Sequence, residues 1–490
     1  MVWKKTWFNF VIWTLFVVFG AFFLTLGTQY FLAKNFGLTE IYYYVGGVCL
    51  CLLLGAGLFF VATKIKASLA GKDIKAFVMP LIFFIVVAAS MTYMGYIAFG
   101  GIVLNVNSDD IANLSVISDA YVGGKGFYPS SNLSDFAFSG IMFGVFSFIG
   151  NHAYAAIFVQ FLIKMIAFVF MLIGVYNFSG YWGGITFSLL SCFLPGQLFS
   201  FFRINTFWVF YAVFAIAFFW LSLIYKAVYY ESHNKGLIVS AVLLGLLIGT
   251  ITYDNAFGII LFFLSALTAL IGGKWSDEEP ESKPVSKYLL ALLICGIAVI
   301  TYAAFTFFLG IDPDLTLKFD YYTRIPVVYS VDTFAVGIVA IFGVYAYFSR
   351  RLTEGCLGGM FVFLISLAFL QLDITRFEDL SVVYFGLVLG ASLLFGAMFI
   401  NTPEDVALTV ARTEDSDENE AAAAVMEKVL EEKEKEKEAE EPKIKFFKSP
   451  IPEPKKHVSR VVDYDHEFND ELLKDYDIVV EDDDDYDILD

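Results

Sequence analysis

The sequence predicts an all-α membrane protein with many transmembrane helices, and three observations carry that prediction. The chain of 490 residues is 58% hydrophobic and 18% aromatic, with 55 Phe, far above the usual content of a soluble domain. Apolar stretches long enough to cross a bilayer recur up to about residue 400. Because no water satisfies backbone groups inside lipid, such stretches are expected to be helices.

Twelve apolar stretches qualify as spans. The first follows the basic start MVWKKTW, which is typical of a signal sequence. Its apolar part is too long, and no small-residue cleavage site follows, so we expect it to be a retained span. The candidate spans cover residues 7–32, 41–62, 76–104, 153–176, 183–202, 206–225, 236–253, 255–271, 288–310, 332–349, 357–372 and 380–400.

A further apolar stretch, residues 136–150, is short and rich in Gly and Phe, and whether it crosses fixes the sidedness of everything after it. If it does not cross and the amino terminus is cytoplasmic, the inner segments hold 13 Lys and Arg and the outer ones 6. If it does cross, the tally becomes 10 against 9 and the positive-inside bias disappears. We therefore predict twelve spans, an interfacial amphipathic element at 136–150, and two cytoplasmic termini.

The last 90 residues differ from the rest. Residues 401–490 hold 12 Lys and Arg against 30 Asp and Glu, so this tail carries the whole net charge of −18. A Glu- and Lys-rich stretch with helical pair spacing, residues 421–441, precedes a basic, Pro-containing stretch and an acidic end. We expect a mostly disordered tail that serves either as a solubilising appendage or as a docking peptide for a basic cytoplasmic partner.

Several function classes lack support. The chain has no P-loop, no dinucleotide fingerprint and no metalloprotease motif, and nothing indicates nucleic-acid binding. The five Cys lie in or beside apolar stretches without metal-type spacing, so we expect small buried side chains and neither disulfides nor metal ligands. His152 and His233 fall on opposite faces in the predicted topology, which argues against zinc or Ser-His hydrolase chemistry.

The most informative polar stretch is residues 105–129, NVNSDDIANLSVISDAYVGGKGFYP, at the predicted outer face. It contains the acidic pair Asp109 and Asp110, then Asp119, then a Gly-rich turn that ends at Tyr128 and Pro129. The pair also suits a helix N-terminus, where Asn and Ser cap and acidic residues complement the dipole. Capping and catalysis are compatible roles here.

Arginines share this face. Arg203, Arg324 and Arg376 all lie in predicted outer segments, where Arg either contacts phosphate with both arms of its guanidinium or extends to lipid headgroups. Lys164 lies in the middle of a span with Gln160 one turn earlier, and such a costly position implies a neighbour in the bundle or an anionic lipid headgroup.

An outer carboxylate beside cationic side chains suits glycosyl transfer from a lipid-phosphate sugar. The donor already carries a good leaving group, so the enzyme must supply a base for the acceptor hydroxyl and positive charge for the departing phosphate. A carboxylate also stabilises a transition state of oxocarbenium character.

The order of these features resembles the first outer loop of the GT-C membrane glycosyltransferases. The likeness is to the bacterial, family 39-like relatives of the protein O-mannosyltransferase and aminoarabinose transferase group. An apolar span precedes the pair Asp109-Asp110, then Asp119-Ala120 and Gly126-Phe127-Tyr128-Pro129, and an apolar interfacial segment follows. Residues 195–213 and 373–390 are similar to that group's later outer turns, in which an Arg precedes a span. The tail is similar to that of predicted glycosyltransferases from Clostridia-like bacteria.

The resemblance implies two extra helices at 1–75, a GT-C-like catalytic module at 76–400 with its outer loop at 105–152, and the tail at 401–490. It implies that Asp109 or Asp110 is the base, in a protein of the bacterial cell membrane. It also implies a donor site for a polyprenyl-phosphate sugar, formed by Asp119, Tyr128, Arg203, Arg324 and Arg376. No cofactor is expected, although an Asp pair is compatible with a divalent metal. Two departures stand out, since the usual pair is Asp-Glu and the usual position follows the first span.

Two other function classes fit the composition. A lipid or oligosaccharide translocase or polymerase would also use twelve spans, and a non-catalytic scaffold would act through the tail. The large outer loop favours the enzyme, as does the lack of detectable similarity between the halves that inverted-repeat transporters show.

Overall fold

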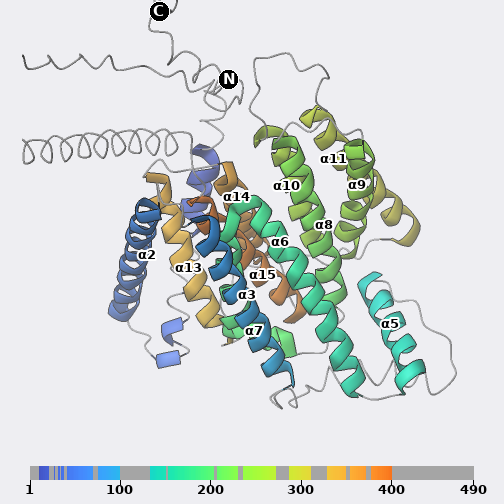
Figure 1. Cartoon of the computed structure of the whole chain (residues 1–490), viewed down its shortest axis with the longest axis horizontal. Helices are drawn as coiled ribbons and strands as arrows, with labels where there is room; N and C mark the ends of the chain where they lie inside the picture. Colours follow the sequence, from blue (N-terminus) through green and yellow to red (C-terminus); the bar gives the residue numbers. More distant parts are fainter. Residues whose placement is uncertain are drawn as a thin grey trace, which may run out of the picture. The chain divides into compact units, whose positions relative to one another are not determined.

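The computed structural model describes residues 10–20, 27, 31–33, 35–37, 41–69, 75–99, 133–150, 153–202, 207–229, 236–271, 286–310, 328–348, 354–370 and 377–399. Every regular element in these ranges is a helix (Figure 1), which confirms the all-α prediction. After a helical segment at Phe10–Gly20, the helices are α2 (Ile41–Leu69), α3 (Lys75–Phe99), α5 (Leu133–Ile149), α6 (Ala153–Phe193), α7 (Pro195–Phe202), α8 (Phe207–Tyr229), α9 (Gly236–Asp254), the 3-10 turn η2 (Ala256–Gly258), α10 (Ile259–Ile271), α11 (Lys287–Leu309), α13 (Val328–Phe348), α14 (Glu354–Leu370) and α15 (Phe377–Ala397).

Eight of these helices are long and apolar enough to cross a membrane, so the chain is a multi-pass membrane protein. Many of their large apolar side chains are exposed, as expected of helices whose solvent is lipid. The eight are α2, α3, α6, α8, α9, α11, α13 and α15. Shorter apolar helices lie at Phe10–Gly20, Phe136–Ile149, Ala256–Leu267 and Gly358–Leu370.

Helix α6 folds back on itself at Gly180. This residue has φ 68° and ψ −166°, a conformation essentially restricted to glycine, and it interrupts the 41-residue helix. The rings of Phe168 and Phe187 stack at 5.8 Å, although residues that far apart on one straight helix would lie roughly 28 Å from each other. The helix is thus a hairpin of two antiparallel arms, as the predicted spans 153–176 and 183–202 require.

The second arm ends earlier than predicted. Helix α6 stops at Phe193, and the short helix α7 begins at Pro195. Proline lacks the N–H that would continue the helix and is favoured in a first helical turn, so residues 183–202 form two elements rather than one span.

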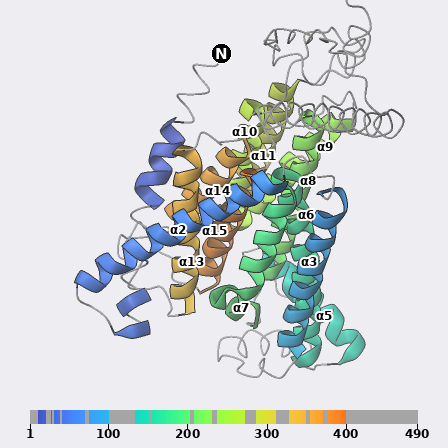
Figure 2. The ribbon, with the colours of Figure 1, turned by 60° about the vertical axis from the view of Figure 1, so that its left-hand side comes forward.

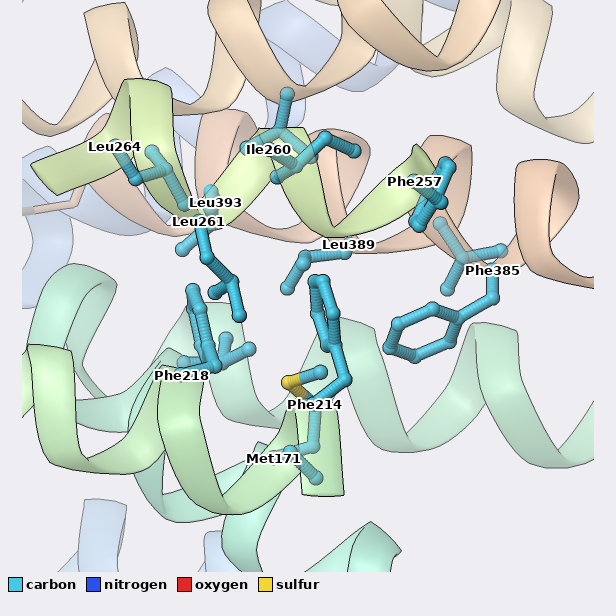
Figure 3. Packing of buried hydrophobic residues seen from close by; sticks show 14 of the residues in the cluster. Met171, Phe214, Phe218, Phe257, Ile260, Leu261, Leu264, Phe385, Leu389 and Leu393 are labelled. Atoms are coloured by element: carbon cyan, nitrogen blue, oxygen red, sulfur yellow. The ribbon is translucent and has the colours of Figure 1, made fainter. Parts of the chain in front are cut away.

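The main hydrophobic core lies where α6, α8, α10 and α15 meet. Phe214 and Phe218 of α8 pack against Phe257 and Leu261 on one side and Phe385 of α15 on another (Figure 3). Helix α15 is the most enclosed helix, since 94% of its apolar window is buried. Its N-terminal part contributes Ser381 and Tyr384 to the candidate functional site.

The N-terminal helices belong to the same bundle. Phe16 is fully buried, and its ring lies 5.4 Å from that of Phe363 in α14. Helix α2 packs on α13 (Figure 2). Cys51 and Ile341 form this contact. Lys66 of α2 also donates a hydrogen bond of 3.2 Å to the carbonyl of Met398. Cys49 is exposed while Cys51 is buried, so the two thiols point to different sides as expected, although only one of them is buried.

Helix α5 coincides with the apolar stretch whose crossing decides the topology. It packs through Phe138, Met142 and Phe146 on the first turns of α6 and α8, and Phe148 at its far end is 92% exposed. If this helix lies at the outer interface, a cysteine in place of Gly144 reacts with a membrane-impermeant maleimide added to intact cells. The site suits the probe, because a Cβ added there meets no atom within 4 Å.

The matched control is a cysteine at Gly57 of α2, which is equally free of neighbours but lies in the middle of a span. We expect labelling at residue 144 and none at residue 57. Protection at residue 144 until the membrane is permeabilised would contradict the interfacial placement.

Candidate functional site

A set of buried polar side chains lies where α7 meets α13 and α15. Both longer helices pack on α7, and they also pack on each other. Their first turns supply Tyr329, Asp332, Thr333 and Ser381, all buried. We call this region the α7 end, defined by α7 together with the first turns of α8, α13 and α15.

Asp332 is the most unusual residue of the α7 end. Its side chain is fully buried, and its Oδ1 accepts a hydrogen bond of 2.9 Å from the backbone N–H of Gly196 in the first turn of α7. The backbone N–H of Gln197 also bonds to the carboxylate. The aspartate of one helix therefore caps the N-terminus of another, where its negative charge complements the helix dipole.

A hydroxyl network surrounds this aspartate. The rings of Tyr329 and Tyr384 stack at 4.5 Å. Tyr329 and Ser381 share a hydrogen bond of 2.8 Å, and the hydroxyls of Thr333 and Tyr384 are also bonded to each other. These bonds join α13 to α15 directly, so the α7 end holds a polar network and not only an apolar packing contact.

A buried cation lies near the first turn of α8. Lys164 is 1% exposed, and its Nζ lies 4.1 Å from the centre of the Trp208 ring, a cation–π contact strengthened by desolvation. Gln160, one turn earlier on α6, is 3% exposed. Lys164 therefore has a neighbour within the bundle, because its ammonium lies over the ring of Trp208.

Helix α5 is also tied to another helix by an acidic side chain. Oδ1 of Asp254, the last residue of α9, accepts a hydrogen bond of 2.9 Å from the backbone N–H of Ser134. Tyr253 next to it donates a hydrogen bond of 3.1 Å to the carbonyl of Gly310 after α11. The first turn of α5 is therefore attached to the last residue of α9.

The residues predicted to bind and transfer the sugar lie outside the described residues. These are Asp109, Asp110, Asp119, Tyr128, Arg203, Arg324 and Arg376. The acidic tail 401–490 lies outside them too. What the structure does bring together are helices next to them in the chain. Arg203 follows α7 by one residue, Arg324 precedes α13 by four and Arg376 precedes α15 by one.

Two residues of this region escaped the sequence analysis. Asp332 was assigned only to the start of a span, although an acidic residue inside the apolar run VYSVDTFAVGIVAIF is itself a signal. Asp254 lies between two of the predicted spans, and no sequence pattern links it to Ser134, 120 residues away.

The described residues supply acid, cation and hydroxyl chemistry at this end of the bundle, but no ready metal site. No group of three or more His, Cys, Asp or Glu able to hold a metal is found within them. The arrangement suits recognition of an anionic group by buried positive charge.

No family model, curated protein or solved structure matches the sequence or the fold.

Proposed function

We propose that this protein is a membrane glycosyltransferase that moves a sugar from a polyprenyl-phosphate donor to an acceptor at the outer face. One observation carries the proposal, namely the convergence of α7, α13 and α15. Each of these three mutually packed helices is flanked in the sequence by one of the three arginines expected to contact the donor phosphate. In this proposal the three arginines act on the departing phosphate, whose negative charge guanidinium donors stabilise.

Two further features support the same site. The buried Lys164 adds positive charge beside Trp208, which lies five residues after Arg203 in the sequence. Helix α5 begins directly after the loop of the acidic pair and packs on the first turn of α8. The carboxylate-bearing loop and the arginine-bearing turn thus adjoin packed helices.

The topology in this proposal has twelve passes. The eight long helices give nine passes, because α6 is counted as two. Three shorter helices supply the others, namely Phe10–Gly20, α10 with η2, and α14. Helix α5 stays at the interface. The α7 end then faces outward, the Lys and Arg excess faces the cytoplasm, and the tail is cytoplasmic. A divalent metal bound by the acidic pair is compatible with this chemistry, and no other cofactor is proposed.

The decisive experiment supplies membranes with a radiolabelled polyprenyl-phosphate hexose. We expect membranes that carry the protein to transfer label from the lipid to an acceptor. Replacing Arg203, Arg324 and Arg376 by Gln should lower the rate about 100-fold or more, as loss of preorganised charge donors does. The matched control replaces Arg350 and Arg351 by Gln, because these lie in the predicted cytoplasmic segment between α13 and α14.

Equal transfer by membranes with and without the protein would reject the proposal. A second candidate, a lipid translocase, is favoured by Lys164 and Asp332, since buried ionisable groups within spans mark transport pathways in many carriers. Movement of a fluorescent polyprenyl phosphate between leaflets without any transfer of sugar would favour that alternative.

A further inference from the structure

The N-terminus of α7 has no cap from its own chain segment. The residue before Pro195 is Leu194, whose apolar side chain cannot accept a hydrogen bond from the first turn. Oδ1 of Asp332 accepts that bond instead, from α13, 136 residues later in the sequence. Within an apolar bundle, where water does not reach the N–H groups, such a borrowed cap is what satisfies them.

The contact between the two helices leaves no room for adjustment. A Cβ built on Gly196 would lie 2.6 Å from Oδ2 of Asp332 and would also overlap the ring of Tyr329. Only glycine permits this approach, so α7 is seated directly on the face of α13 that carries Tyr329 and Asp332. The contact between α7 and α13 therefore fixes both the distance and the relative orientation of the two helices at this point.

A carboxylate in this position is more than packing requires. Oδ2 of Asp332 has no hydrogen-bond partner among the described residues, although the side chain is fully buried. Burial of a carboxylate with one unsatisfied oxygen is unfavourable, and an apolar residue of similar shape would avoid that cost. The position of Asp332 therefore fits a role in orienting α7 better than a role in stabilising the bundle.

We propose that Asp332 is a positioning residue, which fixes α7 and through it Arg203, the residue that follows α7 in the sequence. The inference rests on the proposed function, because it assigns Arg203 to the donor phosphate. Helix α7 has only eight residues, so it is roughly 12 Å long and transmits a shift at its first turn directly to its last. Arg203 follows that last turn immediately.

The test compares two replacements of Asp332. Asn keeps an oxygen that accepts from Gly196, whereas Leu has the same branching and no acceptor. We expect Asp332→Leu to raise the KM for the polyprenyl-phosphate hexose about 10-fold or more, since small displacements of binding groups have effects of this size. We expect Asp332→Asn to retain a KM within roughly threefold of the parent protein, as a conservative cap does.

Ser392→Ala provides the control. It removes a buried hydrogen bond within α15, to the carbonyl of Val388, outside the α7 end, and the KM of this variant should not change. In an Arg203→Gln background, Asp332→Leu should add little, because both changes would disable one contact. Independent, multiplicative effects of the two changes would overturn the proposal, as would an equal KM for the Leu and Asn variants.

A second measurement does not depend on activity. Hydrogen exchange followed by mass spectrometry should show faster exchange across residues 195–202 in Asp332→Leu than in the parent protein, Asp332→Asn or Ser392→Ala. Unchanged exchange there would reject the positioning role. Faster exchange in a protein whose parent form transfers no sugar would reject the proposed function while leaving the anchoring of α7 intact.

Discussion

Replacing both Asp109 and Asp110 by Asn is expected to lower sugar transfer by roughly 10²–10⁴-fold, the usual contribution of a general base. The amide is nearly isosteric with the carboxylate but cannot accept a proton from the acceptor hydroxyl or stabilise an oxocarbenium-like transition state. Because the change preserves shape and hydrogen-bonding capacity at the predicted helix N-terminus, the protein should still insert and fold. The measurement is the initial rate with a labelled polyprenyl-phosphate hexose at equal amounts of folded protein.

The single variants sharpen this result. The residue that acts as the base should account for nearly all of the loss when replaced alone, and its neighbour should have a much smaller effect. A matched control replaces another adjacent acidic pair, Glu404 and Asp405, by Gln and Asn, at the start of the tail. Full activity of the Asp109→Asn, Asp110→Asn double variant would remove the pair from the site.

A large effect on stability is expected at Gly390. A Cβ added there would lie 2.8 Å from the backbone nitrogen of Phe363 and 3.0 Å from the carbonyl oxygen of Gly359. Backbone atoms cannot swing aside as a side chain does, so Gly390→Leu must push α14 away from α15. The expected cost is about 3 kcal/mol, at the upper end of the usual range for overpacking.

Gly57→Leu is the control for this prediction. Gly57 also lies in an apolar helix, but a Cβ there meets nothing within 4 Å. In detergent, the Gly390 variant should elute as aggregate or lose its monodisperse peak at a lower temperature, whereas the Gly57 variant should match the parent. Equal melting of all three would show that α14 and α15 do not approach this closely.

The helices could be predicted from the sequence because bilayer length and apolar composition determine them almost alone. The predicted bounds of α9 and α11 differ from those observed by only a residue, and the hairpin of α6 was expected from two apolar runs. What those runs do not encode is local backbone chemistry. Pro195 starts a separate helix, so the predicted span 183–202 became two elements. Gly180 closes the hairpin between this span and the one before it through a left-handed φ.

The site was harder to predict because its hydrogen bonds join residues that lie far apart in the sequence. A loop of carboxylates and a few arginines can be recognised by residue type, whereas Asp332 acts on Gly196 and Asp254 on Ser134 through contacts that span more than a hundred residues. Both aspartates serve the first turn of a helix that belongs to another part of the chain. Sequence patterns for helix capping involve only the residues next to the end of a helix, so they do not predict pairs from distant parts of the chain.

The hydrogen bond from Lys66 to Met398 has a consequence for how the protein is made. Lys66 lies in α2, which is synthesised early, and its acceptor follows α15, the last of the described helices to leave the ribosome. Until that carbonyl arrives, the ammonium must stay at the membrane surface, which a lysine near a helix end does by extending its side chain. A chain that ends before α15 therefore lacks the acceptor of this hydrogen bond, and α2 loses this link to the last described helix.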